Sequence, residues 1–251
     1  MKKQHTSISI ISLVFLMLCS ITSFSQNTSE QEDSKTSNDT LVFKQKYGLR
    51  LGIDLSKPVR SFLDDDYTGF EINADYRLTK RLYLAGELGT EENNLVTDYL
   101  DVTSKGSYFK AGVDYNMYLN WLDMENMIYG GLRAGVSTFS QTLNNYTIYN
   151  PDQYWNEPFS PSDTKEFDGL SAIWAELIIG IKAETLNNLY VGLNLQLKGL
   201  VSENAPSDFE NLYIPGFNRT YDSGRFGIGF GYNISYLIPI YKKDKKVAKE
   251  D

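Results

Sequence analysis

The feature that most constrains the fold of this chain is a series of segments in which apolar and polar residues alternate strictly. In Phe70–Leu78 every second side chain is apolar, and the side chains between them are Glu71, Asn73, Asp75 and Arg77. A period of two is typical of a β-strand with one face in an apolar and the other in a polar environment. The chain is therefore predicted to be all-β.

Eight segments of this kind follow one another, each about as long as the 9–11 residues that a tilted strand needs to cross a bilayer. They are Tyr47–Leu55, Phe70–Leu78, Leu82–Gly89, Tyr108–Met117, Ile128–Ser137, Ile173–Glu184, Leu189–Lys198 and Phe226–Tyr236. Ile178 breaks the phase of the sixth segment. An even number of alternating segments predicts an eight-stranded antiparallel up-and-down transmembrane β-barrel.

The links between these segments alternate in length. Thr79–Arg81 and Thr185–Asn188 are tight turns, whereas the stretches near 90–107, 138–170 and 202–222 are long, polar and rich in Asn, Asp, Ser and Pro. Outer-membrane barrels have short periplasmic turns and long surface loops. We therefore expect an integral outer-membrane protein with both termini in the periplasm and its long loops outside the cell.

Alternation alone does not say which face points inward, and a soluble lipocalin-like barrel would have its apolar face inside. The membrane arrangement is favoured because the apolar faces are nearly free of charge in all eight segments. Aromatic residues also recur near segment ends, as at membrane interfaces; they are Tyr47, Phe70, Tyr115, Tyr236 and Tyr241.

The polar faces carry cations and anions in near balance. A narrow interior requires this, because an unpaired buried charge is costly whereas a hydrogen-bonded network is tolerated. We predict an interior charge network of Arg50, Asp54, Glu71, Asp75, Arg77, Glu87, Lys110, Asp114, Arg133, Glu176, Lys182, Glu184 and Lys198. Since an eight-stranded barrel is only wide enough for its own side chains, structural pairing is favoured over acid–base catalysis and over a diffusion channel.

The N-terminus predicts export. Lys2 and Lys3 precede an apolar stretch, and Ser23 and Ser25 are the small residues that signal peptidase reads, so 1–25 is expected to be a signal peptide cleaved before Gln26. The alternatives are a lipoprotein modified at Cys19, for which Leu18 is a poor fit, and a transmembrane anchor, for which the run is short.

The remaining chain divides into three parts. Residues 26–46 are rich in polar residues and are predicted to be a disordered periplasmic lead-in. Residues 47–241 form the predicted outer-membrane β-barrel, and 242–251 form a basic periplasmic tail.

Cleavage would remove the only histidine, His5, and the only cysteine, Cys19. Lipid-modifying barrels that use Ser with His would lack their base, and transition metals would lack imidazole and thiolate ligands. The net charge of −8 becomes −10 once Lys2 and Lys3 are lost, which does not favour nucleic-acid binding. We expect no catalytic residues and no cofactor.

Two surface segments are candidates for binding. Asp64–Asp66 could provide oxygen ligands for Ca²⁺, although a solvated acidic loop tip is favoured because adjacent side chains diverge. The longest loop, Asn144–Asp168, carries aromatic side chains that could contact a partner protein or a glycan, or could pack on the barrel rim. These candidate contact residues are Tyr146, Tyr149, Tyr154, Trp155 and Phe159.

Four stretches of the chain also resemble a known family. They are GLRLGIDLSKPVRSFLDDDYTGFEINADYRLTKRLYLAGELG (48–89), GSYFKAGVDYNMYLNWLDMENMIYGGLRAG (106–135), STFSQTLNNYTIYN (137–150) and GRFGIGFGYNISYLIPIY (224–241). They are similar to an uncharacterised family of Bacteroidota outer-membrane β-barrels, a domain of unknown function. The resemblance implies a β-barrel in the outer membrane and supplies no catalytic residues.

The sequence thus predicts a non-enzymatic outer-membrane barrel with surface loops for envelope integrity or for binding a partner or glycan. The alternatives are a lipid-modifying outer-membrane enzyme and a narrow ion or solute conduit. The expected partners are outer-membrane lipid and an extracellular protein or glycan, without nucleic acid, and the barrel is expected to be a monomer.

Overall fold

The structure, a computed structural model, describes residues 44–118, 125–147, 164–206, 209–220 and 224–244. The predicted signal peptide, most of the predicted lead-in and most of the predicted tail lie outside these ranges. The first strand begins at Lys44 and the last ends at Asp244, so both predicted barrel boundaries were three residues too narrow.

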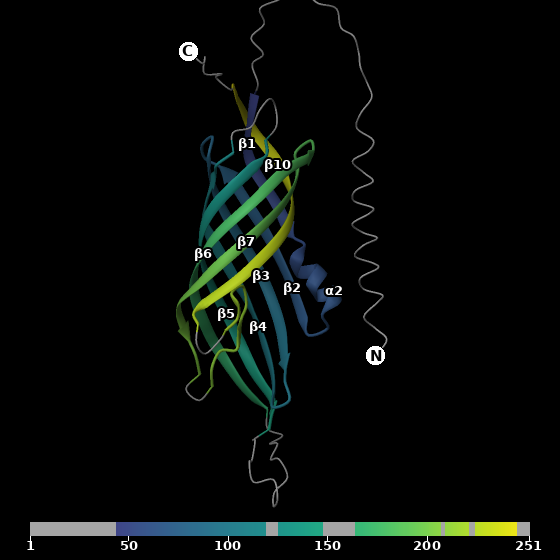
Figure 1. Cartoon of the computed structure of the whole chain (residues 1–251), viewed down its shortest axis with the longest axis vertical. Helices are drawn as coiled ribbons and strands as arrows, with labels where there is room; N and C mark the ends of the chain where they lie inside the picture. Colours follow the sequence, from purple (N-terminus) through teal and green to yellow (C-terminus); the bar gives the residue numbers. More distant parts are fainter. Residues whose placement is uncertain (1–43, 119–124, 148–163, 207–208, 221–223, 245–251) are drawn as a thin grey trace, which may run out of the picture. The chain divides into compact units, whose positions relative to one another are not determined.

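Eight long strands form one closed barrel in which all neighbouring strands are antiparallel, which confirms the predicted number and direction of strands (Figure 1). They are β1 (Lys44–Asp54), β2 (Tyr67–Arg77), β3 (Leu82–Val96), β4 (Leu100–Asn116), β5 (Met127–Tyr146), β6 (Lys165–Leu186), β7 (Leu189–Asn204) and β10 (Phe226–Asp244). The ring closes where β1 pairs with β10.

Three short elements complete the described chain. The helix α2 (Ser56–Leu63) lies between β1 and β2, and the two-residue strands β8 (Tyr213–Ile214) and β9 (Asn218–Arg219) pair between β7 and β10. We call the end of the barrel that holds these elements the distal end, and the end that holds the start of β1 and the end of β10 the terminal end.

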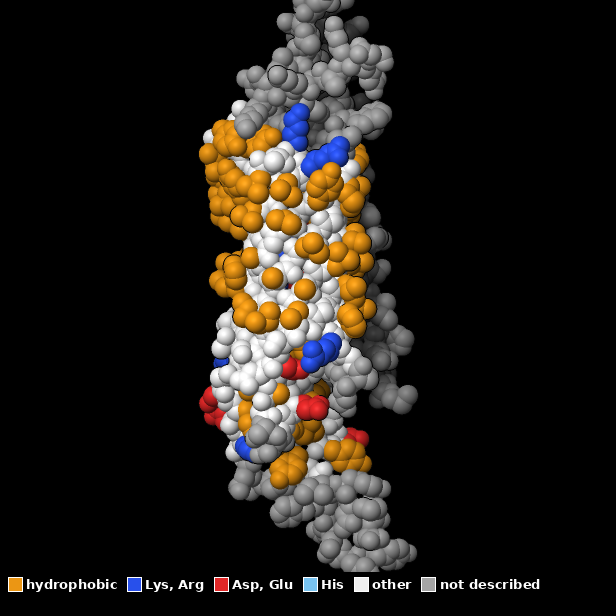
Figure 2. All heavy atoms as spheres, turned by 90° about the vertical axis from the view of Figure 1, so that its left-hand side faces the viewer, with side chains coloured by type: hydrophobic (Ala, Val, Ile, Leu, Met, Phe, Trp, Pro, Cys, Tyr) orange, Lys and Arg blue, Asp and Glu red, His pale blue; other side chains and the backbone are white. Residues whose placement is uncertain are grey.

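Alternation along each strand separates the two faces of the sheet. In β2, Phe70 and Ile72 are exposed on the outside, whereas Glu71 and Asp75 are buried inside. The exposed apolar side chains form a belt, and charged side chains lie at its two ends (Figure 2). No helix in the described part of the chain is long and apolar enough to span a membrane.

Two residues depart from the expected pattern. Ile178, which breaks the alternation of β6, is buried inside the barrel in an apolar cluster with Tyr83, Met127 and Tyr129. Tyr47 was expected near a membrane interface but is buried, because the pairing register of β1 shifts between Tyr47 and Gly48.

The distal links are shorter than predicted, because the strands run well beyond the apolar belt. Only 97–99 separate β3 from β4, β5 continues to Tyr146, and β6 begins at Lys165. In these extensions the outer face is polar, as at Glu92 and Lys105, and the inner face mixes buried polar residues such as Ser104 and Gln141 with buried apolar ones such as Phe139. The loops predicted near 90–107 and 138–170 were therefore too long, because strands with a polar outer face show little hydrophobic alternation.

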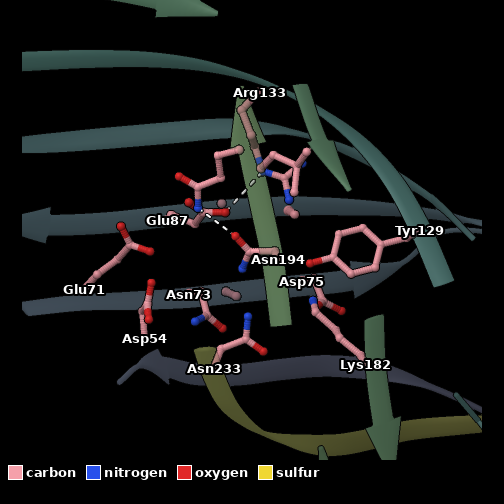
Figure 3. A pocket seen from close by; sticks show the side chains of 15 residues that line it. Asp54, Glu71, Asn73, Asp75, Glu87, Tyr129, Arg133, Lys182, Asn194 and Asn233 are labelled. Carbon is pink, nitrogen blue, oxygen red and sulfur yellow. Dashed lines mark hydrogen bonds and ion pairs between the residues drawn. The ribbon is translucent and has the colours of Figure 1, made fainter. Parts of the chain in front are cut away.

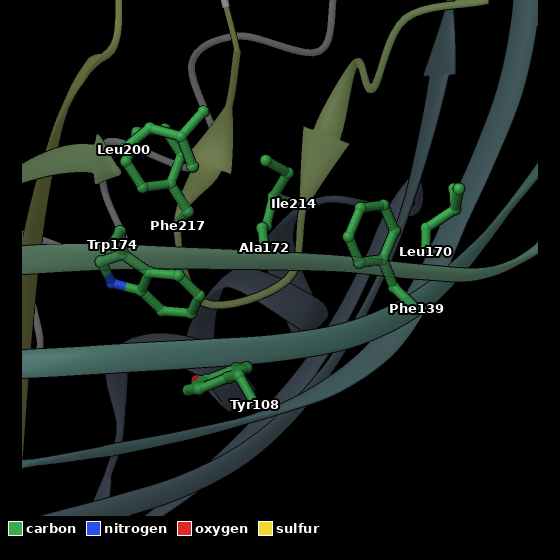
Figure 4. Packing of buried hydrophobic residues seen from close by; sticks show 8 residues of the cluster. All are labelled: Tyr108, Phe139, Leu170, Ala172, Trp174, Leu200, Ile214 and Phe217. Atoms are coloured by element: carbon green, nitrogen blue, oxygen red, sulfur yellow. The ribbon is translucent and has the colours of Figure 1, made fainter. Parts of the chain in front are cut away.

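The segment 209–220 was predicted to belong to a surface loop but packs into the distal end of the barrel. Ile214 and Phe217 are fully buried and join a cluster with Tyr108, Phe139 and Trp174, among other residues (Figure 4). Gly216, between them, has a φ of +82°, and a Cβ there would lie 2.6 Å from Cγ of Tyr108. We call 209–220 the plug segment.

The plug segment should contribute to the stability of the barrel. Phe217→Ala removes a fully buried ring from the apolar cluster and is expected to lower the free energy of unfolding by about 3–5 kcal/mol. Phe62→Ala, which truncates a ring of α2 that is 89% exposed, is the matched control. Urea titration of the folded protein in lipid vesicles measures both, and equal losses would contradict the packing described.

Candidate functional site

The interior of the barrel holds the predicted charge network. All of its predicted members except Glu87 and Glu184 are buried, and these two are partly buried. The predicted charged residues lie on seven of the eight barrel strands, β1 to β7. The network therefore forms only when the ring closes. Its geometry divides into a central part and two ends.

One central cluster is built on Asp75 of β2. Its Oδ1 lies 2.6 Å from Nε of Arg50, and its Oδ2 lies 2.6 Å from Nζ of Lys182. The Arg50 guanidinium also lies 5.0 Å from the ring centroids of both Tyr83 and Tyr190. A single carboxylate therefore bridges cations of β1 and β6 across the barrel, and two aromatic rings add cation–π contacts.

The second central cluster is a chain of alternating charges. Lys110 lies 3.1 Å from Glu71 and also contacts Glu87, and Arg133 lies 3.4 Å from Glu87 and 2.8 Å from Asp114. Each cation lies between two carboxylates. Buried charges require this kind of compensation, because the cost of removing them from water is large.

Little space remains between these clusters. The cavity there has a volume of about 20 Å³ and is lined by charged and amide side chains, including Asp54, Asn73, Asn194 and Asn233 (Figure 3). A single water molecule needs about 10–15 Å³ measured in this way. In this part of the chain the interior is therefore filled, and it has room for water rather than for a substrate.

The other predicted members lie toward the ends of the barrel. At the terminal end Arg77 lies 3.0 Å from Glu125, and Lys46 lies 3.2 Å from Glu184. The sequence did not identify Glu125 or Lys46, because each lies outside the alternating segments.

Two members have weaker ionic partners than the central clusters. Lys198 is 3.8 Å from Glu176, whose Oε1 accepts a hydrogen bond from the indole of Trp174. Asp54 instead accepts hydrogen bonds from the backbone N–H groups of Ser56 and Tyr232. It therefore fixes the backbone at the point where β1 ends and α2 begins.

A third cluster, at the distal end, is centred on Glu91 of β3. This carboxylate is fully buried, forms an ion pair with Lys57 of α2, and accepts hydrogen bonds from the Tyr213 hydroxyl at 2.7 Å and the Gly216 N–H at 3.0 Å. It thus joins α2 and the plug segment to the barrel wall. Glu91 continues the inward phase of Glu87 two steps further, which is the signal that could have identified it.

The distal cluster lies beyond the apolar belt, since the outward neighbours of Glu91 are Thr90 and Glu92. Burial raises the pKa of Glu91, but Lys57 and the two hydrogen bonds outweigh that effect and lower the pKa to about 2. The carboxylate is therefore ionised and acts as an anchor, with no role that requires a proton near neutral pH.

The structure describes only some of the surface residues that were predicted to bind a partner or a metal ion. Tyr146 is the last residue of β5, whereas Tyr149, Tyr154, Trp155 and Phe159 lie outside the described residues. Of the acidic tip, Asp64 directly follows α2, and its carboxylate lies 3.3 Å from Nε of Arg60. Among the described residues no group of three or more His, Cys, Asp or Glu side chains is placed to hold a metal ion.

The lowered pKa of Glu91 predicts a pH-dependent stability. A carboxyl with a folded-state pKa of about 2 and an ordinary value of 4.5 stabilises the fold above pH 4.5, and this stabilisation is lost as the pH falls through 2. Glu91→Gln is expected to lower the free energy of unfolding at pH 7 by about 3 kcal/mol.

The measurement is urea unfolding of parent and variant between pH 7 and pH 2. The difference between them should shrink as the pH falls below 4.5. Glu92→Gln is the control, because the neighbouring carboxylate is 48% exposed and is paired with the exposed Lys105. A constant difference across this range, or an equal loss for the control, would contradict the assignment.

Comparison with known proteins identifies the family of the chain. No curated protein matches it. A family model described as a domain of unknown function (DUF6048) matches residues 6–243, which is nearly the entire chain. The chain that forms this closed barrel with a filled interior therefore belongs to the DUF6048 family.

Proposed function

We propose that this protein is a non-enzymatic integral β-barrel of the outer membrane of a Gram-negative, Bacteroidota-type cell. Its role would be that of a closed scaffold that supports envelope integrity or binds a partner protein or glycan at its distal end. The observation that carries the proposal is the combination of an apolar outer face with an interior filled by paired charges.

The outer face supports a lipid environment. Along β7, Leu193, Leu195 and Leu197 are 49%, 65% and 48% exposed, and equivalent apolar residues continue on the neighbouring strands. A continuous apolar belt of this extent is a liability in water, whereas lipid solvates it. Over most of the ring the strand backbones also have partners within the sheet, as the bilayer core requires.

The orientation follows from the two ends. The described turns at the terminal end are short, with residues 78–81 and 187–188 linking their strands. The distal end carries the polar strand extensions, α2 and the plug segment. By the usual topology of such barrels, the termini would face the periplasm and the distal end would face the outside of the cell.

The filled interior favours a scaffold over a conduit. Ion pairs cross the barrel at Asp75 and at Glu87, and the plug segment packs into the distal end above them. Solutes would have to displace both layers. Because the interior of the barrel is filled, we propose that a partner binds to the outer surface of the distal end, which includes the strand extensions.

Membrane insertion and topology can be tested with single cysteines. Leu195→Cys lies in the belt, Lys105→Cys on the outside of a distal strand extension, and Lys80→Cys in a turn at the terminal end. A membrane-impermeant maleimide added to intact cells should label only Lys105→Cys. Lys80→Cys should become reactive after the outer membrane is opened, and Leu195→Cys only after unfolding.

The parent chain, whose only cysteine is Cys19, gives the background for this labelling. Labelling of Leu195→Cys in the folded protein would show that the belt faces water and would overturn membrane insertion. Labelling of Lys80→Cys but not Lys105→Cys in intact cells would reverse the orientation.

The closed interior predicts that the barrel does not conduct ions. Purified protein reconstituted in a planar bilayer should give no discrete conductance steps, because the two layers of side chains block the path. A porin incorporated in the same bilayer set-up is the positive control. Reproducible steps from the full chain would favour the conduit instead.

A further inference from the structure

The barrel wall has a lateral gap at its distal end, where β1 is too short to fill the space between β2 and β10. Pairing of β1 with β10 ends at Asp54–Asn233, followed by one hydrogen bond from Leu55 N to Tyr232 O. Pairing of β1 with β2 ends at Ile53–Ile72. The first residues of β10, 226–231, and of β2, 67–71, therefore have no β1 residue between them.

The helix α2 covers one side of this gap. The Ser61 hydroxyl accepts a hydrogen bond from the Gly69 N–H at 2.8 Å, which caps the edge of β2. On the β10 side, the Asn218 side-chain amide donates a hydrogen bond to the Ile228 carbonyl at 3.3 Å, and the edge next to Phe230 faces a cavity. Because alternate residues of a strand direct their N–H and C=O groups to the same side, those of Phe230 point the same way as those of Tyr232, into the gap.

The cavity between α2 and β10 has a volume of about 280 Å³ and reaches from the outside to the inside of the wall. That volume is close to the lower limit of small-molecule pockets, roughly 300 Å³. Gly229, at an inward position on β10, lines this cavity and leaves room for it: a Cβ on Gly229 would lie 2.8 Å from Oε1 of Gln196 and 3.2 Å from Nζ of Lys198.

The outer part of the cavity is apolar. Its lining includes Val59 and Leu63 of α2 and Ile228 and Phe230 of β10, which are 47%, 65%, 77% and 58% exposed. Phe62, also on α2, is 89% exposed. In the proposed membrane orientation this opening faces lipid, so a hydrocarbon chain can occupy it without leaving an apolar environment.

The inner part of the cavity is polar, and among the cations that line it Lys198 is the one without a close carboxylate partner. Most of the charges that line it are compensated elsewhere: Lys57 by Glu91, Arg60 by Asp64, and Glu71 by Lys110. Asp54 accepts two backbone hydrogen bonds, as described above.

Lys198, which also lines the cavity, differs from these groups. It is 2% exposed, donates to the Gly216 carbonyl at 2.6 Å, and is 3.8 Å from Glu176. An ammonium has three N–H donors, so Lys198 keeps donors for an acceptor in the cavity. The acceptor best suited to a buried ammonium is an anionic oxygen, because charge-assisted hydrogen bonds are the stronger ones.

We propose that this gap is a binding site for a single-chain amphiphile with an anionic headgroup, which enters sideways from the membrane. Its carboxylate or phosphate oxygens bind Lys198 at the inner end, and its hydrocarbon chain leaves between α2 and β10. The proposal rests on the membrane insertion proposed above and adds a ligand class to a barrel whose centre is closed.

Spin-labelled amphiphiles in vesicles that contain the folded protein test the site. The probes are a long-chain fatty acid, a lysophosphatidic acid and an uncharged monoacylglycerol, each with a nitroxide on its chain. Electron paramagnetic resonance measures the motionally restricted fraction. We expect the protein to restrict at least one anionic probe at least tenfold more tightly than the monoacylglycerol, and the preferred probe identifies the headgroup as carboxylate or phosphate.

Two variants remove the site by different means. Gly229→Val fills the inner cavity, and Lys198→Met removes the cation; each is expected to weaken binding of the anionic probe at least tenfold. Gly86→Val, which places a branched side chain where a Cβ has at least 3.6 Å of clearance, and Lys105→Met, which removes an exposed ammonium, are the controls and should bind like the parent.

Unchanged binding by a folded Gly229→Val would overturn the proposal, even if Lys198→Met failed to fold. Equal restriction of the uncharged probe, or restriction of none, would overturn it as well. The cysteine labelling separates this outcome from failure of membrane insertion: a protected Leu195→Cys together with no selective binding would reject the ligand site alone.

Discussion

The arrangement of the whole barrel depends on the mutual neutralisation of charges that its closed sheet keeps away from water. A ring of eight strands leaves room for side chains and little else, so each inward Lys, Arg, Asp or Glu must find its partner inside the lumen. Asp75 meets two cations, and Lys110 and Arg133 each lie between two carboxylates. Because partners come from different strands, the same contacts that offset desolvation also fix the strands relative to one another.

At the distal end, a different set of contacts compensates the buried charge. Glu91 is compensated by Lys57, by the Tyr213 hydroxyl and by the Gly216 N–H, so one carboxylate fixes both the helix that follows β1 and the plug segment. The early end of β1 leaves an opening that α2 covers on one side only. The Glu91–Lys57 ion pair, which anchors α2, therefore also fixes one side of the opening in the wall.

The sequence was sufficient to predict the number, direction and facing of the strands, because each has one apolar and one polar or glycine-rich face within the belt. It was also sufficient to list the inward charges within the belt, since Asp75, Lys110 and Arg133 alternate with outward apolar neighbours. It failed where that contrast disappears. The extensions that carry Ser104 and Gln141 have a polar outer face and a mixed inner face, and the inward packing of Ile214 and Phe217 depends on partners that are distant in the chain. Glu91 was missed because it lies in such an extension, and Lys57 was missed because it lies in the helix α2 and not in an alternating strand.

Closure of the ring between β1 and β10 has a consequence for how the chain reaches this state. The pair that seals the sheet joins Lys44 to Asp244, the first and last described residues. Contacts so distant in sequence are slow to form, because the entropy of closing the intervening loop is lost before the pairing compensates for it. Until that step, β1 and β10 both present unpaired edges that invite association with other chains. Pairing of β10 with β1 thus completes the barrel, and the protein is most vulnerable to aggregation immediately before this pairing forms.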